Sequence, residues 1–466
     1  MRYVSTRGEA PVLGFEDALL AGLARDGGLY VPETWPTFSR DTIAGFAGKP
    51  FHDVAAAVVG ALSGGAIPEA DLARMTREAY ATFGHAAVTP LVQISPGTFI
   101  LELFHGPTLA FKDVALQLLG LLFEEFLARG GDPLTIVGAT SGDTGSAAID
   151  AVAGRARIDI FMLHPQGRVS DVQRRQMTTV LAPNVHNIAM DGTFDDAQAM
   201  VKRMFNDPAM TSRFAIGAVN SINWARLMAQ VVYYFAAALQ LGAPQRKVAF
   251  AVPTGNFGDV FAGYVAAQMG LPVERLIVAT NVNDILHRAL STGDYSAGKV
   301  TPTAAPSMDI QVSSNFERLL FDLGGRDGAA TAAQMGTFEA SKAMQLTNRQ
   351  REGAAKLFSS ARADPDDMAQ ALRWAYEQTG ELLDPHTAIG LHAARASGLP
   401  GDVPVVTLAT AHPAKFRDAV ERATGQRPSL PARIGDLFER AERMSELPGD
   451  YAAIADYIAA HAVPRG

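Results

Sequence analysis

The chain contains no cysteine, and this absence excludes several kinds of chemistry at once. Disulfide bonds, thiolate nucleophiles and zinc or iron–sulfur sites with cysteine ligands all require that residue. The sequence also has no apolar run long enough to cross a membrane without interruption by glycine, proline or charge. The N-terminal residues lack the apolar core of a secretory signal, so we expect a cytoplasmic protein without a membrane partner.

Basic residues are not concentrated in any segment of the chain. The formal net charge is −8 and there is no basic stripe, so nucleic acid is not an expected partner. An apolar content of 48% and a charged content of 19% are typical of a soluble globular enzyme. His105, His386 and His412 have no metal-ligand spacing, so no metal is expected.

Strand and helix patterns alternate through most of the chain after about residue 95. The predicted strands are the short apolar runs 134–137, 158–163, 248–252, 276–279 and 403–408. Strands that alternate with helices predict an α/β fold with parallel sheets, which bind ligands beyond the carboxyl ends of their strands. At 466 residues the chain exceeds what one core usually supports, so more than one lobe is expected. Residues 1–95 indicate a mainly helical N-terminal domain, and residues from about 325 to 382 a peripheral helical insertion.

A lysine at a predicted helix start is the first candidate for chemistry. Lys112 follows a Gly-Pro turn, and the apolar residues after it recur at helical spacing: Val114, Leu118, Leu121 and Leu122. Burial against such a face disfavours the ammonium form, and a neutral amine can form a Schiff base with an aldehyde cofactor. Taken alone, an ordinary lysine whose head reaches water or pairs with Asp113 is the more common case.

Two predicted strands run into glycine-rich loops that open helices. The loop over residues 138–146, Gly-Ala-Thr-Ser-Gly-Asp-Thr-Gly-Ser, has more hydroxyls and glycines than a helix cap needs, which favours an anion site. The loop over residues 253–259, Pro-Thr-Gly-Asn-Phe-Gly-Asp, is neither a Walker loop nor a dinucleotide fingerprint. Its backbone could cradle a phosphate, and a tight strand-to-helix connection explains it equally well.

A hydroxyl at the end of the last predicted strand is a further candidate, beside the lysine and the two loops. Thr410 lies where it can hydrogen-bond a ligand heteroatom, and no G-x-S-x-G elbow offers a serine nucleophile instead. Pyridoxal 5′-phosphate would use a desolvated lysine, one anion-binding loop and this hydroxyl for its aldehyde, phosphate and ring nitrogen. An amino-acid substrate would place its carboxylate in the remaining loop.

Several segments together resemble the threonine synthases, in the longer branch that has an N-terminal extension. They are Asp-Gly-Gly-Leu-Tyr-Val-Pro-Glu at 26–33, Glu-Leu-Phe-His-Gly-Pro-Thr-Leu-Ala-Phe-Lys-Asp at 102–113, Ala-Thr-Ser-Gly-Asp-Thr-Gly at 139–145, Pro-Thr-Gly-Asn-Phe-Gly-Asp at 253–259, Ala-Thr-Asn-Val-Asn-Asp at 279–284 and Thr-Ala-His-Pro-Ala-Lys-Phe at 410–416. The resemblance implies the tryptophan-synthase-β-like pyridoxal phosphate fold, with the cofactor between two open parallel-sheet lobes. The smaller lobe would span about 110–225, and the larger 96–109 and 226–466.

The resemblance also assigns residues to the site. Lys112 matches the Schiff-base lysine, and Thr410 the hydroxyl that faces the pyridine nitrogen. The phosphate-loop positions are Gly255, Asn256, Phe257 and Asp259, with Asp259 interpreted as ordering the loop from its helix start. The loop for the substrate carboxylate contains Thr140, Ser141, Asp143 and Thr144, and more distant relatives have asparagine in place of Asp143.

The implied reaction converts O-phospho-L-homoserine and water into L-threonine and phosphate, by γ-elimination of phosphate and β-addition of water. Lys112 would hold the cofactor and then move protons at Cα and Cβ. The candidates for binding the substrate phosphate are Arg7, Arg226, Arg318 and Lys415. Alternatives are a phospho-lyase that yields 2-oxobutyrate, a serine/threonine dehydratase or β-replacement enzyme, and a non-catalytic pyridoxal phosphate carrier or sensor. The expected assembly is a monomer or a homodimer.

Overall fold

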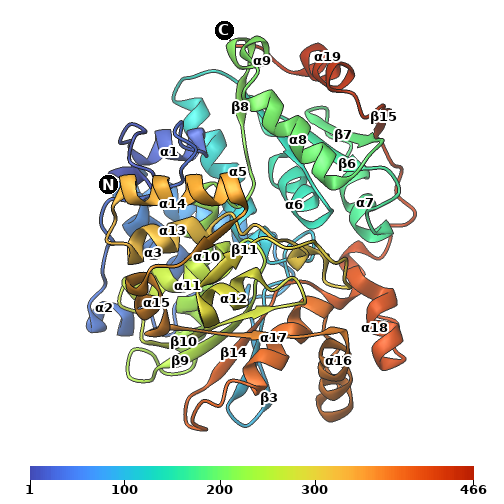
Figure 1. The fold of residues 1–466 in the computed structure, drawn as a ribbon. Helices are drawn as coiled ribbons and strands as arrows, with labels where there is room; N and C mark the ends of the chain where they lie inside the picture. Colours follow the sequence, from blue (N-terminus) through green and yellow to red (C-terminus); the bar gives the residue numbers. More distant parts are fainter. Residues whose placement is uncertain (466) are drawn as a thin grey trace.

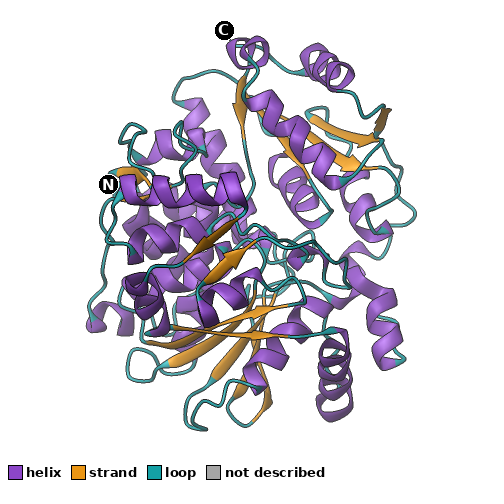
Figure 2. Cartoon of the chain, in the orientation of Figure 1, coloured by secondary structure: helices purple, strands orange, loops and turns teal. Residues whose placement is uncertain are grey.

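Two separate sheets, each with helices packed on it, divide the structure into two lobes (Figures 1 and 2). The structure is a computed structural model and describes residues 1–465. The larger sheet has the order β13 (Phe358–Arg362), β10 (Val273–Thr280), β9 (Val248–Pro253), β14 (Val405–Ala409), β4 (Thr98–Glu102) and β3 (Leu91–Ser95). All its neighbours pair in parallel except β3, which is antiparallel to β4.

The smaller sheet is entirely parallel. Its order is β15 (Ser445–Leu447), β7 (Val185–Met190), β6 (Ile158–Pro165), β5 (Leu134–Ala139) and β8 (Ala215–Gly217). The helices of this lobe are α6 (Asp143–Val152), α7 (Asp171–Thr178), α8 (Phe194–Phe205), α9 (Pro208–Arg213) and α19 (Tyr451–His461). The two parallel-sheet lobes confirm the predicted fold class, and all the strands predicted from sequence are present.

Two long helices form the centre of the molecule. α5 (Lys112–Ala128) and α10 (Trp224–Gln240) pack on each other and are buried on nearly every face, as expected of helices that are apolar all round. The N-terminal residues form α1 (Phe15–Ala21), α2 (Arg40–Ala44), α3 (Phe51–Ser63) and α4 (Glu69–Ala81), and a small pair of β1 (Tyr3–Ser5) with β2 (Tyr30–Pro32). α3 and α4 pack against the central helices, so the N-terminal region shares the main core.

The remaining helices belong to the larger lobe. They are α11 (Gly258–Gln268), α12 (Ile285–Thr292), α13 (Phe316–Leu323), α14 (Gly328–Ser341), α15 (Asn348–Ala355), α16 (Pro365–Thr379), α17 (Pro385–Arg395) and α18 (Arg417–Thr424), with the short 3₁₀ turns η1 (Pro306–Met308), η2 (Pro413–Phe416) and η3 (Ala432–Ile434). A second small pair joins β11 (Asp294–Ser296) to β12 (Ala343–Gln345). No helix among the described residues is long and apolar enough to cross a membrane.

The structure differs from the sequence-based division in two places. The segment interpreted as a helical insertion also contributes β13, an edge strand of the larger sheet, whose polar Ser359 and Ser360 gave no apolar run. The C-terminal segment, assigned with residues 226–466 to the larger lobe, returns to the smaller one, where β15 pairs with β7 (Figure 1). There Ile454 and Ile458 of α19 pack in the same core as Phe161.

Candidate functional site

The loops singled out in the sequence lie at the carboxyl ends of β5, β9 and β14, as the rule for parallel sheets requires. α5 begins at Lys112, which confirms the predicted helix start, and its predicted apolar face is buried. Just before it, the amide of Phe111 donates a 2.9 Å hydrogen bond to the carbonyl of Thr410. Lys112 and the loop after β14 are therefore joined through the backbone.

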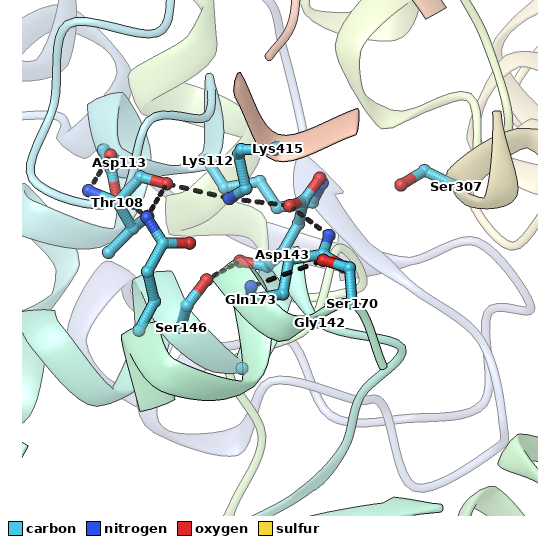
Figure 3. Close-up of polar contacts among 12 residues, drawn as sticks. Thr108, Lys112, Asp113, Gly142, Asp143, Ser146, Ser170, Gln173, Ser307 and Lys415 are labelled. Atoms are coloured by element: carbon cyan, nitrogen blue, oxygen red, sulfur yellow. Dashed lines mark hydrogen bonds and ion pairs between the residues drawn. The ribbon is translucent and has the colours of Figure 1, made fainter. Parts of the chain in front are cut away.

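A buried carboxylate is flanked by two lysines (Figure 3). Lys112 Nζ lies 3.3 Å from Asp143 Oδ2, and Lys415 Nζ lies 2.7 Å from Asp143 Oδ1. Gln173 Nε2 donates to the same Oδ1 over 2.7 Å. Asp113, which the sequence offered as a partner of Lys112, instead accepts from the hydroxyl and the amide of Thr108.

The electrostatics of this cluster favour a neutral Lys112 and an ionised Asp143. Burial lowers the pKa of Lys112, and the positive charges of Arg226 and Lys415 lower it further against the opposing effect of Asp143. Burial would raise the pKa of Asp143, but the charges of Lys415 and Lys112 outweigh it and hold this pKa below its ordinary value. A neutral amine beside a stable carboxylate suits nucleophilic chemistry.

The hydroxyl-rich loop over residues 139–146 presents unpaired amides. Among residues 1–465, the amides of Ser141, Asp143 and Thr144 have no hydrogen-bond acceptor, as is usual for the first turn of a helix. The Thr140 hydroxyl accepts from the amides of Gly142 and Gly145, so its oxygen orders the loop itself. Ser141 is exposed and Thr144 half-buried. This helix start can therefore bind an anion through its amides.

The loop over residues 254–259 also presents free amides. Two of its carbonyls are hydrogen-bonded elsewhere in the protein, since Gly255 accepts from the hydroxyl of Ser313 and Asn256 from the amide of Asn315. Phe257 has a φ of +64°, and within the described part of the chain the amides of Gly255, Asn256 and Phe257 have no acceptor. A run of free amides before a helix is suited to a phosphate group.

Asp259 and Thr410 differ in whether their side chains are already hydrogen-bonded within the protein. Asp259 Oδ1 accepts hydrogen bonds from the hydroxyls of Tyr233 and Tyr234, so its contacts are with α10, in keeping with an ordering role. Burial raises the pKa of Asp259 to about 6. The Thr410 hydroxyl, by contrast, makes no hydrogen bond to any residue in the range 1–465. It is the free hydroxyl at this strand end.

The four candidates for binding the substrate phosphate differ in whether their positive charge is already paired. Arg7 is paired with Glu317 and Glu339, and Lys415 with Asp143. Arg318 donates to the carbonyls of Tyr30 and Ile222 and to the Asn315 side chain. Arg226 is only 3% exposed, its Nε has no partner, and no carboxylate of residues 1–465 pairs with it. Burial lowers the pKa of Arg226 to about 10.

Two glutamines of the site, Gln173 and Gln176, were not identified from the sequence. Gln173 holds Asp143, and the carbonyl of Thr108 accepts from both Lys415 Nζ, at 2.8 Å, and Gln176 Nε2, at 2.9 Å. The available signal was a pair of glutamines three positions apart, which lie on one face of α7 with Val172 and Met177. No group of residues suited to a metal ion is present in the described chain.

Comparison with known proteins gives a consistent result. Family models match in sequence order: threonine synthase N terminus at residues 2–80, pyridoxal-phosphate dependent enzyme at 82–363 and threonine synthase, C-terminal, at 387–458. A threonine synthase of Pseudomonas aeruginosa is 55% identical over 99% of this chain and 98% of its own length. The structure of a pyridoxal-phosphate-bound threonine synthase from Brucella melitensis matches with a TM-score of 0.97 and 55% identity over 99% of both chains. The yeast threonine synthase structure gives 0.93 and 40% identity over 99% of this chain and 98% of that one.

Proposed function

The chain belongs to the threonine synthase family, and we propose that Lys112 is the residue that anchors its pyridoxal 5′-phosphate and then moves protons on the substrate. The enzyme converts O-phospho-L-homoserine and water into L-threonine and phosphate, a pyridoxal-phosphate-dependent lyase reaction. The predicted cofactor and activity are thereby confirmed. The roles of individual residues are the proposal.

The residues present fit this cofactor. Free amides at Gly255–Phe257 suit its phosphate, and a Cβ on Gly255 would lie 2.4 Å from the carbonyl oxygen of Ser307, so only glycine leaves the cradle intact. The unbonded hydroxyl of Thr410 suits the ring nitrogen, and buried Lys112 suits the aldehyde. When bound, the cofactor supplies the electron sink that makes protons at the substrate Cα and Cβ removable.

Lys112 performs two tasks in this proposal. Its neutral amine, favoured by burial, is the nucleophile that joins the aldehyde. Once the substrate amine has replaced it, the free Lys112 amine accepts and returns protons at Cα and Cβ while phosphate leaves Cγ and water adds at Cβ. Because the amine lies in a buried site, a proton that it carries is not lost to bulk water.

The substrate carboxylate and phosphate require separate anion sites. The amides of Ser141, Asp143 and Thr144 support binding of the carboxylate at the start of α6. Arg226 is the candidate for the substrate phosphate, since it is the buried guanidinium among the four whose Nε lacks a partner. An unpaired buried cation near Lys112 gains most from a dianionic ligand.

Reduction of the holoenzyme with borohydride, followed by peptide mapping, tests the central claim. We expect the reduced cofactor on Lys112, and we expect Lys112→Ala to lack the visible Schiff-base absorption. The wild type should release phosphate and threonine in equal amounts. A label on another lysine contradicts the proposed anchor, and 2-oxobutyrate as the product contradicts the reaction.

The proposal also covers the compartment, the assembly and the partners of the enzyme. It acts in the cytoplasm as a monomer or a homodimer, without a nucleic acid or membrane partner; the dispersed charge of −8 supports the absence of nucleic acid. Cell fractionation and light scattering of the purified protein test the compartment and the assembly.

A further inference from the structure

Lys415 is a buried lysine that the proposed reaction does not use. Its side chain is fully buried. Its Nζ forms an ion pair with Asp143 Oδ1 at 2.7 Å and donates a hydrogen bond to the carbonyl of Thr108 at 2.8 Å. It is closer to the carboxylate than Lys112 is, at 3.3 Å. η2, which contains Lys415, begins three residues after Thr410, so Lys415 enters the site on the same loop.

While Lys112 is still protonated, this cluster contains one carboxylate and two ammonium groups. Attachment consumes the charge of Lys112: its ammonium releases one proton to solvent, its nitrogen bonds to the aldehyde carbon, and its last two hydrogens leave with the carbonyl oxygen as water. A carboxylate buried like Asp143 would then lack a counter-ion and would take up a proton. Lys415 remains in place and prevents this.

We propose that Lys415 is a positioning residue that acts through Asp143: it balances the charge of this carboxylate and holds it in place, so that Lys112 can give up its own charge on joining the cofactor. The inference rests on the proposed function, in which Lys112 is the attachment point. The side chain of Lys415 is shielded from solvent, and the contacts of its Nζ with Asp143 and with the carbonyl of Thr108 are both within the protein.

The charges around Lys112 determine the sign of the effect. Asp143 of α6 and Asp259 of α11 are its acidic neighbours, and Arg226 of α10 and Lys415 of η2 its basic ones. Lys415 is itself faced by Asp143 and by Asp113. Removing Lys415 takes away a positive neighbour and leaves Asp143 to Lys112 alone, and both changes raise the pKa of Lys112. Attachment then requires a higher pH.

The test is the pH dependence of cofactor attachment. The full-length chain is freed of cofactor with hydroxylamine and dialysis, pyridoxal 5′-phosphate is added, and the rate of appearance of the Schiff-base absorption is followed across pH. For Lys415→Met we expect the midpoint about one unit higher, hence about tenfold slower attachment at a pH below both midpoints. Lys415→Arg retains the charge and should keep the wild-type midpoint.

Gln173→Leu is the matched control. It removes a neutral hydrogen bond to the same Asp143 oxygen, also 2.7 Å long, and leaves both ammonium groups. A charge role for Lys415 predicts an unchanged midpoint in Gln173→Leu. An equal shift in this variant and in Lys415→Met would mean that Lys415 only supports local structure, and an unshifted Lys415→Met would overturn the proposal outright.

A double variant keeps the test decisive if Lys415→Met does not fold. Asp143→Asn with Lys415→Met removes both members of the buried pair, which proteins tolerate better than the loss of one. Because the carboxylate through which Lys415 acts is absent there, its midpoint should lie close to that of Asp143→Asn alone, and a midpoint about one unit higher would overturn the proposal. Borohydride trapping distinguishes failure of the proposed function from failure of this inference. A label away from Lys112 refutes the proposed function, whereas a label on Lys112 with an unshifted midpoint in Lys415→Met refutes only the role of Lys415.

Discussion

The backbone bond from the Phe111 amide to the Thr410 carbonyl, 2.9 Å long, ties the start of α5 to the loop after β14. Lys112 is the next residue on one side of this bond, and the Thr410 hydroxyl lies on the other. The proposed attachment point and the proposed partner of the ring nitrogen are therefore held in a constant relation. Hydrogen bonding at this contact is independent of side-chain identity, so variants at Thr410 leave it intact.

Replacing Thr410 tests whether its hydroxyl contacts the cofactor. Thr410→Val has nearly the same shape without the hydroxyl, and we expect a loss of one hydrogen bond, about 1 kcal/mol or roughly fivefold in cofactor affinity. Thr410→Ser retains the hydroxyl and should bind as the wild type does. Cofactor titration followed by absorbance measures both, and equal affinity in the two variants would argue that the hydroxyl has no ligand.

Removing the guanidinium of Arg226 tests the substrate-phosphate site. For Arg226→Met we expect KM for O-phospho-L-homoserine to rise by roughly ten- to a hundredfold, because a hydrogen bond to a charged group contributes about 1.5–3 kcal/mol. Inhibition by inorganic phosphate should weaken in parallel. Arg7→Met is the control, since Arg7 is already paired with Glu317 and should affect stability instead of KM. Steady-state kinetics showing the larger KM effect in Arg7→Met would exclude Arg226 as the phosphate ligand.

A methyl group at Gly255 should damage the phosphate cradle. The added Cβ would meet the Ser307 carbonyl oxygen at 2.4 Å, and backbone on both sides has little freedom to move. We expect Gly255→Ala to lower the free energy of unfolding by about 1–3 kcal/mol, as overpacking does, and to weaken cofactor binding. Gly336→Ala in α14 has open space around it and should be neutral or stabilising by up to about 1 kcal/mol. Chemical denaturation and cofactor titration compare the two, and similar effects would contradict a tight cradle.

The buried carboxyl of Asp259 should make stability depend on pH. Its pKa in the folded protein is raised to about 6 from an ordinary 3.8, so the folded state favours its protonated form. Stability from this group is therefore fully present below the unfolded pKa and falls as pH rises through the folded value, by about 3 kcal/mol at most.

Asp259→Asn removes this titration while its oxygen can still accept from Tyr233 and Tyr234. The free energy of unfolding of the variant should gain on the wild type between about pH 4 and pH 6 and then run parallel to it. Taking the difference between the two proteins cancels the contribution of Asp113, whose pKa burial also raises to about 6. A difference that stays constant over this range would show that Asp259 does not titrate there.

Much of the site was predictable because it depends on local chemistry. The apolar spacing after Lys112 determines a buried helix face, and glycine-rich loops between a strand and a helix leave free amides whatever the rest of the chain does. The strand ends also placed Thr410 correctly. The edge strand β13 and the short β15 were not predictable, since each is stabilised by the neighbouring strand and not by an apolar pattern of its own.

Short-range periodicity and turn chemistry depend on neighbouring residues, so they were enough to predict the fold class, the lysine at the start of α5 and the two glycine-rich loops with free amides. Which charged groups lie next to one another depended on the tertiary structure. The sequence left four equivalent candidates: Arg7, Arg226, Arg318 and Lys415. Folding paired Arg7 with Glu317 and Lys415 with Asp143, and it left Arg226 buried without a carboxylate partner among residues 1–465. Ion pairs between distant segments depend on which groups are buried together in the folded protein. A local sequence pattern does not show which groups these are.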